Sequence, residues 1–80
     1  MQIEDFLEII KVELPESGDI IEGNTKFRGL DEWDSLTGMS IIVLLEETYK
    51  IPVPDDVFKS FNTFEDMYNY ILKKNESLYK

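Results

Sequence analysis

The sequence predicts an all-α fold, a small four-helix bundle of three main helices and one short helix, with a long loop between the first two. Apolar residues recur at helical spacing in three segments, and prolines follow two of these segments. Aliphatic residues and prolines alternate over residues 51–54, and the two prolines make this segment a poor β-strand. With 80 residues, we expect one domain over 1–80 with an ordered core of about 2–75.

The first helix is expected over residues 2–13, and Pro15 ends it. Its apolar side chains form one stripe: Ile3, Phe6, Leu7, Ile10 and Leu14. A long connection follows over residues 15–33. Loops of this length are usually functional or held by their own side chains. We therefore expect its apolar residues to pin it across the bundle, with room for a short helical turn: Ile20, Ile21, Phe27 and Leu30.

The second main helix is expected over residues 35–49. Asp34 is a good N-cap, because its carboxylate can accept backbone N–H groups of the first turn. Pro52 and Pro54 require the helix to end before them.

A short helix over 55–60 and a last helix over 63–75 complete the fold. Thr63 with Asp66 three residues later is a loose capping box. We expect the chain beyond Asn75 to fray.

The composition excludes several classes of function. Without cysteine or histidine, the chain has no disulfide, no zinc site built on those residues and no Ser-His or Cys-His nucleophilic pair. The net charge of −9 disfavours binding to nucleic acids and anionic lipids. It favours protein partners with basic patches, although it also serves solubility.

The sequence also bears on location. The acidic start is unlike a secretory signal peptide, and the apolar run at 39–45 is too short to cross a bilayer. We therefore expect a cytoplasmic monomer without membrane insertion.

The second helix carries two apolar stripes where a small bundle needs only one. One stripe consists of Ile41, Ile42, Leu45 and Tyr49, and the other of Leu36, Met39 and Val43. We expect the second stripe to be exposed as a docking surface for a partner, edged by Glu46 and Glu47. The alternative is that the long loop covers it.

Ser35 is expected at the first position of this helix, where free N–H groups and the helix dipole favour a phosphate ester. By itself, a serine that begins a helix is common. Catalysis is disfavoured because Lys50 is distant and no histidine is present. A calcium loop over 31–42 fails, because Trp33 and Ile42 stand where oxygen ligands are needed.

The tetrapeptide Trp33-Asp34-Ser35-Leu36 resembles the attachment motif of acyl carrier proteins, "DSL" in its "WDSL" variant. The resemblance extends over about residues 3–74. It includes the order and spacing of four further segments: Leu44-Leu45-Glu46-Glu47-Thr48-Tyr49, Val53-Pro54-Asp55-Asp56, Phe61-Asn62-Thr63-Phe64 and Tyr68-Asn69-Tyr70-Ile71.

This resemblance implies a carrier that is not an enzyme. A phosphopantetheinyl transferase would attach 4′-phosphopantetheine from coenzyme A to Ser35, beside Asp34, and the arm would carry acyl groups as thioesters. Acyl-loading and acyl-processing enzymes with basic patches would dock on the second helix. Their apolar contacts would be Leu36, Met39 and Val43, and their ionic contacts Asp34, Glu46 and Glu47. The resemblance also implies an interior able to shelter an acyl chain, lined by Ile10, Ile42, Leu45, Phe61, Tyr68 and Ile71.

Two features depart from the pattern of fatty acid synthesis. Thr37, Gly38 and Ser40 stand where the family often has acidic residues. Several aromatic residues would also narrow the interior: Phe61, Phe64, Tyr68 and Tyr70. The cargo thus stays open among fatty acid, polyketide and related secondary biosynthesis. An aminoacyl or peptidyl carrier and an unmodified helical adaptor remain alternatives.

Overall fold

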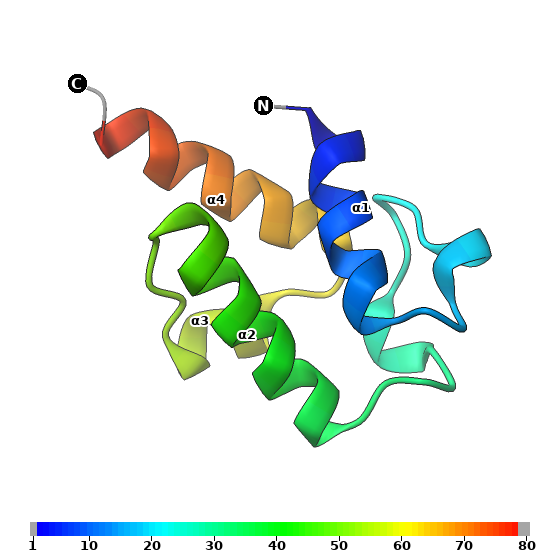
Figure 1. The fold of residues 1–80 in the computed structure, drawn as a ribbon. Helices are drawn as coiled ribbons and strands as arrows, with labels where there is room; N and C mark the ends of the chain where they lie inside the picture. Colours follow the sequence, from blue (N-terminus) through cyan, green and yellow to red (C-terminus); the bar gives the residue numbers. More distant parts are fainter. Residues whose placement is uncertain (1, 79–80) are drawn as a thin grey trace.

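The computed structural model describes residues 2–78, and it is all-α as expected. Over this range, the helices are α1 (Ile3–Glu13), α2 (Ser35–Tyr49), α3 (Asp55–Ser60) and α4 (Phe64–Leu78) (Figure 1). The connection between α1 and α2 contains two short 3₁₀ turns, η1 (Gly18–Ile20) and η2 (Phe27–Gly29). These are the helical turns for which the sequence left room.

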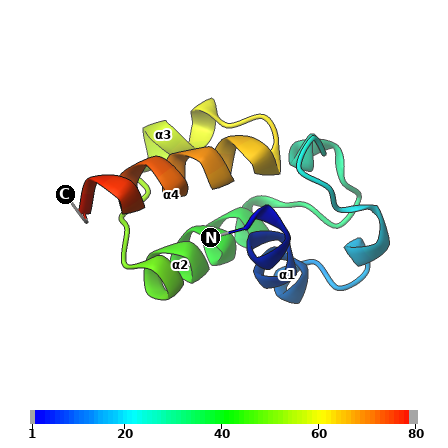
Figure 2. The ribbon, with the colours of Figure 1, turned by 90° about the horizontal axis from the view of Figure 1, so that it is seen from above.

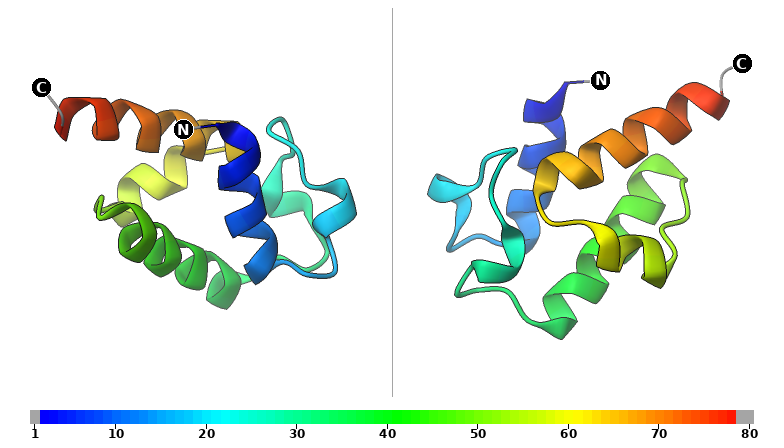
Figure 3. Two further views of the ribbon diagram at one scale, coloured as in Figure 1. Left: turned by 45° about the horizontal axis from the view of Figure 1, so that its top comes forward. Right: turned by 180° about the vertical axis from the view of Figure 1, so that it is seen from behind.

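The helices enclose one apolar core. Figure 2 shows α1 and α2 on one side, α3 and α4 on the other, and the long connection at one end. The view from behind brings α3 and α4 to the front (Figure 3). Among the side chains that the structure describes, nine large ones in the core are fully buried: Phe6, Ile10, Leu14, Phe27, Ile41, Leu45, Phe64, Met67 and Ile71. Of the six residues expected to line the interior, Ile42 and Tyr68 are only half-buried.

Local signals in the sequence account for the helix ends. Asp34 caps α2, and Lys50 ends it in the left-handed region at φ 60°, donating its N–H to the carbonyl of Glu46. Thr63 and Asp66 form the reciprocal capping box, because each backbone N–H donates to the other's side chain.

The last helix extends beyond residue 75, where the sequence predicted its end; the fraying of the tail stays a prediction, and residues 79–80 lie outside the described part of the chain. Helix α4 continues to Leu78. The residues that follow Asn75 are Glu76, Ser77 and Leu78, and this segment has no proline or glycine to stop the helix.

Polar contacts and one aromatic ring hold the long connection. The Glu32 carboxylate accepts the backbone N–H groups of Ser17 at 3.0 Å and Glu16 at 3.3 Å. The Glu65 N–H donates to the carbonyl of Gly23 at 2.7 Å, which joins the connection to the start of α4. Phe27 is fully buried, as expected.

One expectation for the connection fails. Ile20 is exposed instead of pinning the loop. Ile20 is the last residue of the turn η1, whereas the next residue, Ile21, has an extended backbone and is buried. Ile21 therefore takes the place in the core.

The capping box makes stability depend on pH. The backbone N–H groups of Asn62 and Thr63 donate to the Asp66 carboxylate at 2.8 and 3.0 Å and lower its pKa. A carboxyl whose pKa is lower in the folded state stabilises the fold above its unfolded pKa of about 3.9, and this stabilisation is lost as pH falls through the folded value. We expect the free energy of unfolding to drop on acidification, and less steeply in Asp66→Asn. Urea unfolding followed by circular dichroism at several pH values measures the slope.

The control for this experiment is Asp19→Asn, which changes an exposed carboxylate in η1. It should keep the wild-type slope. An Asp66→Asn profile as steep as that of the wild type would contradict the assignment.

Candidate functional site

Ser35 is the first residue of α2, and its side chain is exposed. In Figure 1 the start of α2 lies at the lower end of the molecule, opposite both chain ends. The hydroxyl is therefore accessible at the end of a well-formed helix. This agrees with the position expected from the sequence.

Asp34 is the N-cap residue of α2 and accepts hydrogen bonds from the first turn of the helix. Its carboxylate accepts the Thr37 N–H at 2.7 Å, and its carbonyl accepts the Gly38 N–H at 3.0 Å. The bond from Thr37 is the main reason that the pKa of Asp34 is lowered, so this side chain is ionised at neutral pH. The Asp34 carboxylate thus uses the Thr37 N–H, one of the groups expected to be free beside Ser35, whereas the Gly38 N–H makes the ordinary first bond of the helix.

Trp33 packs on the backbone of α2 beside Ser35. A Cβ atom placed on Gly38 would lie 3.3 Å from Cζ2 of Trp33 and 3.8 Å from Cε2 of Phe58. The indole is stacked with the Phe58 ring, with centroids 6.3 Å apart and planes at 11°. Gly38 therefore lets an aromatic ring lie between α2 and α3.

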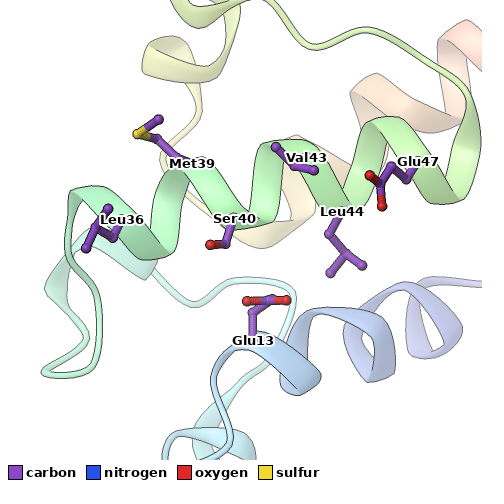
Figure 4. Close-up of a pocket in the computed structure, with 7 residues that line it drawn as sticks. All are labelled: Glu13, Leu36, Met39, Ser40, Val43, Leu44 and Glu47. Carbon is purple, nitrogen blue, oxygen red and sulfur yellow. The ribbon is translucent and has the colours of Figure 1, made fainter.

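The second apolar stripe of α2 is exposed. Leu36, Met39 and Val43 keep 74%, 64% and 50% of their surface accessible. They line a groove of about 420 Å³ between α2 and the end of α1, together with Glu13, Ser40, Leu44 and Glu47 (Figure 4). The alternative that the long loop covers this stripe is wrong. We call this surface the outer groove.

The acidic edge of the outer groove differs from the expected one. Glu47 lines it, but Glu46 is half-buried and its carboxylate accepts the Val53 N–H at 3.1 Å. Glu46 instead lines a neighbouring groove with Met39 and Asp55. The second acid of the outer groove is Glu13, which projects from α1 toward α2 (Figure 4). Sequence reasoning missed Glu13 because only the packing of α1 on α2 brings it there.

Residues 4–71 match the family model described as the phosphopantetheine attachment site. The chain belongs to this family. Searches of curated proteins and of solved structures gave no match. Domains of this family are non-catalytic carriers that hold 4′-phosphopantetheine covalently on a serine. The carrier therefore interacts with a phosphopantetheinyl transferase and with biosynthetic enzymes.

Attachment of such an arm needs a serine whose hydroxyl is accessible to a modifying enzyme. Ser17 is buried, and the Ser60 hydroxyl donates to the carbonyl of Val57 at 2.5 Å. Ser35 and Ser40, both on α2, are exposed. Ser60 is exposed as well, but its hydroxyl already donates within α3, whereas Ser35 and Ser40 lie on α2.

The part of the carrier domain that the structure describes contains no helix that is both long and apolar enough to cross a membrane.

Proposed function

We propose that Ser35 carries the 4′-phosphopantetheine arm and that the protein delivers acyl groups as thioesters to enzymes of fatty acid, polyketide or related secondary biosynthesis. The observation that carries this proposal is the exposed hydroxyl at the first position of α2, inside the sequence Trp33-Asp34-Ser35-Leu36. In the transfer, the Ser35 oxygen forms a phosphodiester with the phosphorus that joins pantetheine to the nucleotide of coenzyme A. The nucleotide leaves, and a base takes the serine proton.

The chain's own chemistry agrees with a passive carrier. It has no cysteine, so the thiol that holds the cargo comes from the arm when it is attached. It also has no histidine to act as a general base beside Ser35. Activation of the serine is then the task of the transferase.

We propose that the outer groove is the surface on which the transferase and the loading enzymes dock. Leu36, Met39 and Val43 offer exposed apolar area beside Ser35, and Glu13 and Glu47 place negative charge along it. Together with the net charge of −9, this favours partners with basic patches around an apolar contact. Glu46 contributes mainly by holding Val53.

The attachment site is tested by intact mass. The protein is incubated with coenzyme A, Mg²⁺ and a promiscuous phosphopantetheinyl transferase. We expect the mass of one arm to be added to the wild type and none to be added to Ser35→Ala. The matched control is Ser40→Ala, which removes the other exposed hydroxyl on α2 and should still be modified.

The outcomes separate the alternatives. Modification of Ser35→Ala, or its loss in Ser40→Ala alone, would contradict Ser35 as the attachment site. No mass gain with several transferases would favour the unmodified adaptor. An aminoacyl or peptidyl carrier bears the same arm, and the cognate loading enzyme then decides between the cargoes.

A further inference from the structure

The packing of side chains inside the carrier domain limits which cargo the interior can hold. This inference rests on the proposed attachment of the arm at Ser35. We infer that Trp33 seals the core against the cargo, so that the acyl group stays outside and Trp33 is a specificity-determining residue. The chemical class this fits is a short or polar acyl group, which gains little from a buried apolar tunnel. A long alkyl chain would have no place inside.

The seal lies beside the serine. A groove at the start of α2 is lined by Ser35, Gly38 and Phe58, and Trp33 lies in the same groove. An arm on Ser35 that turned toward the core between α2 and α3 would meet the indole first. Because the indole is already 3.3 Å from the position of a Gly38 Cβ, no layer of cargo atoms fits between them.

Aromatic rings continue behind Trp33. The centroid of Phe27 lies 4.6 Å from that of Trp33, 5.4 Å from that of Phe64 and 5.9 Å from that of Phe58. Phe61 extends this chain to Tyr70, with centroids 5.6 Å apart. An alkyl chain needs roughly 7 Å between the atoms on its two sides, twice the carbon–carbon contact distance. Rings at these separations are in contact and leave no such gap.

The other approach, from the outer groove between α1 and α2, is closed as well. The two helices that border it contribute Ile10, Ile41 and Leu45 to the core, and all three are fully buried. Farther along, Phe6 packs against Tyr49 and Tyr68, with centroids 6.2 and 5.8 Å away. A chain entering here would have to displace packed side chains.

The inference is tested by loading the carrier with acetyl or octanoyl arms from the corresponding coenzyme A thioesters and comparing backbone amide NMR spectra. In the wild type, we expect the change from acetyl to octanoyl to shift amides near Ser35 and to leave those of Ile10, Leu45 and Ile71 unchanged. Hydroxylamine should cleave both thioesters at the same rate, because neither is shielded.

Two variants locate the seal. Trp33→Ala leaves Gly38 without its covering ring, and we expect octanoyl, but not acetyl, to shift the core amides in this variant. Trp33→Phe keeps an aromatic ring and should behave as the wild type. Circular dichroism shows whether each variant is folded. The comparison of acetyl and octanoyl arms on the wild type tests the inference even if a variant does not fold.

Each possible result contradicts a different part of the proposal. Shifts of core amides in octanoyl wild type, with slower cleavage of that thioester, would overturn the inference while leaving the attachment at Ser35 intact. Unchanged core amides in folded Trp33→Ala would overturn the role of Trp33. Failure of the arm to attach, seen first by mass, would contradict the proposed function itself.

Discussion

Replacing Phe27 with alanine is expected to remove a large part of the stability of the protein. Phe27 is fully buried and its ring contacts Trp33, Phe58 and Phe64. Truncating a buried phenylalanine costs about 3–5 kcal/mol. A domain of 80 residues has a total stability of roughly 4–12 kcal/mol at typical values per residue. Urea unfolding followed by circular dichroism measures the loss.

The effect is large because Phe27 joins the long connection to the helices. The Arg28 guanidinium lies 4.7 Å from the centroid of the Phe27 ring and donates to the carbonyls of Phe58 and Phe61. Val12→Ala is the control, because Val12 is exposed on α1 and should change stability by less than about 0.5 kcal/mol. If Phe27→Ala unfolds at the same urea concentration as this control, Phe27 is not a core residue.

Replacing Met39 with glutamate is expected to weaken docking strongly while the fold persists. Met39 keeps 64% of its surface accessible in the middle of the exposed stripe, so a carboxylate there remains in water in the free protein. In a complex it would be buried against the partner's apolar surface. The loss of a central contact costs roughly 2 kcal/mol, which corresponds to about a thirtyfold decrease in kcat/KM for the transferase.

The matched control for docking is Val12→Glu. Val12 is as exposed as the stripe residues and receives the same change of charge, but it does not line the outer groove. It should retain the wild-type kcat/KM. Equal losses in both variants would mean that added negative charge, and not the outer groove, determines the effect. A large drop in the thermal stability of Met39→Glu would identify Met39 as a core residue.

The sequence predicted the helices well because their ends depend on neighbouring residues. Asp34 and Thr63 cap within their own first turns, and Pro15 and Pro52 follow the helices they limit. The same locality made the two faces of α2 predictable, since helical spacing alone separates the stripe at Met39 from the one at Ile41.

The parts that the sequence did not predict depend on distant contacts. The Glu32 carboxylate binds backbone groups 15 and 16 residues earlier, and Glu13 reaches the outer groove only through the packing of α1 on α2. The sequence singled out Gly38 because it stands where the family often has an acidic residue, whereas in the fold the Trp33 ring packs against it. No periodic pattern encodes these pairings.

The Asp34 cap has a consequence for how a tether at Ser35 would move. Because the carboxylate already holds the Thr37 amide and is ionised, the diester that links an arm to Ser35 meets a like charge instead of a local anion seat. An arm at Ser35 would then be held weakly at the start of the helix, and its far end would sweep a wide volume of solvent. Successive enzymes would collect the load from different directions while the helices stay still.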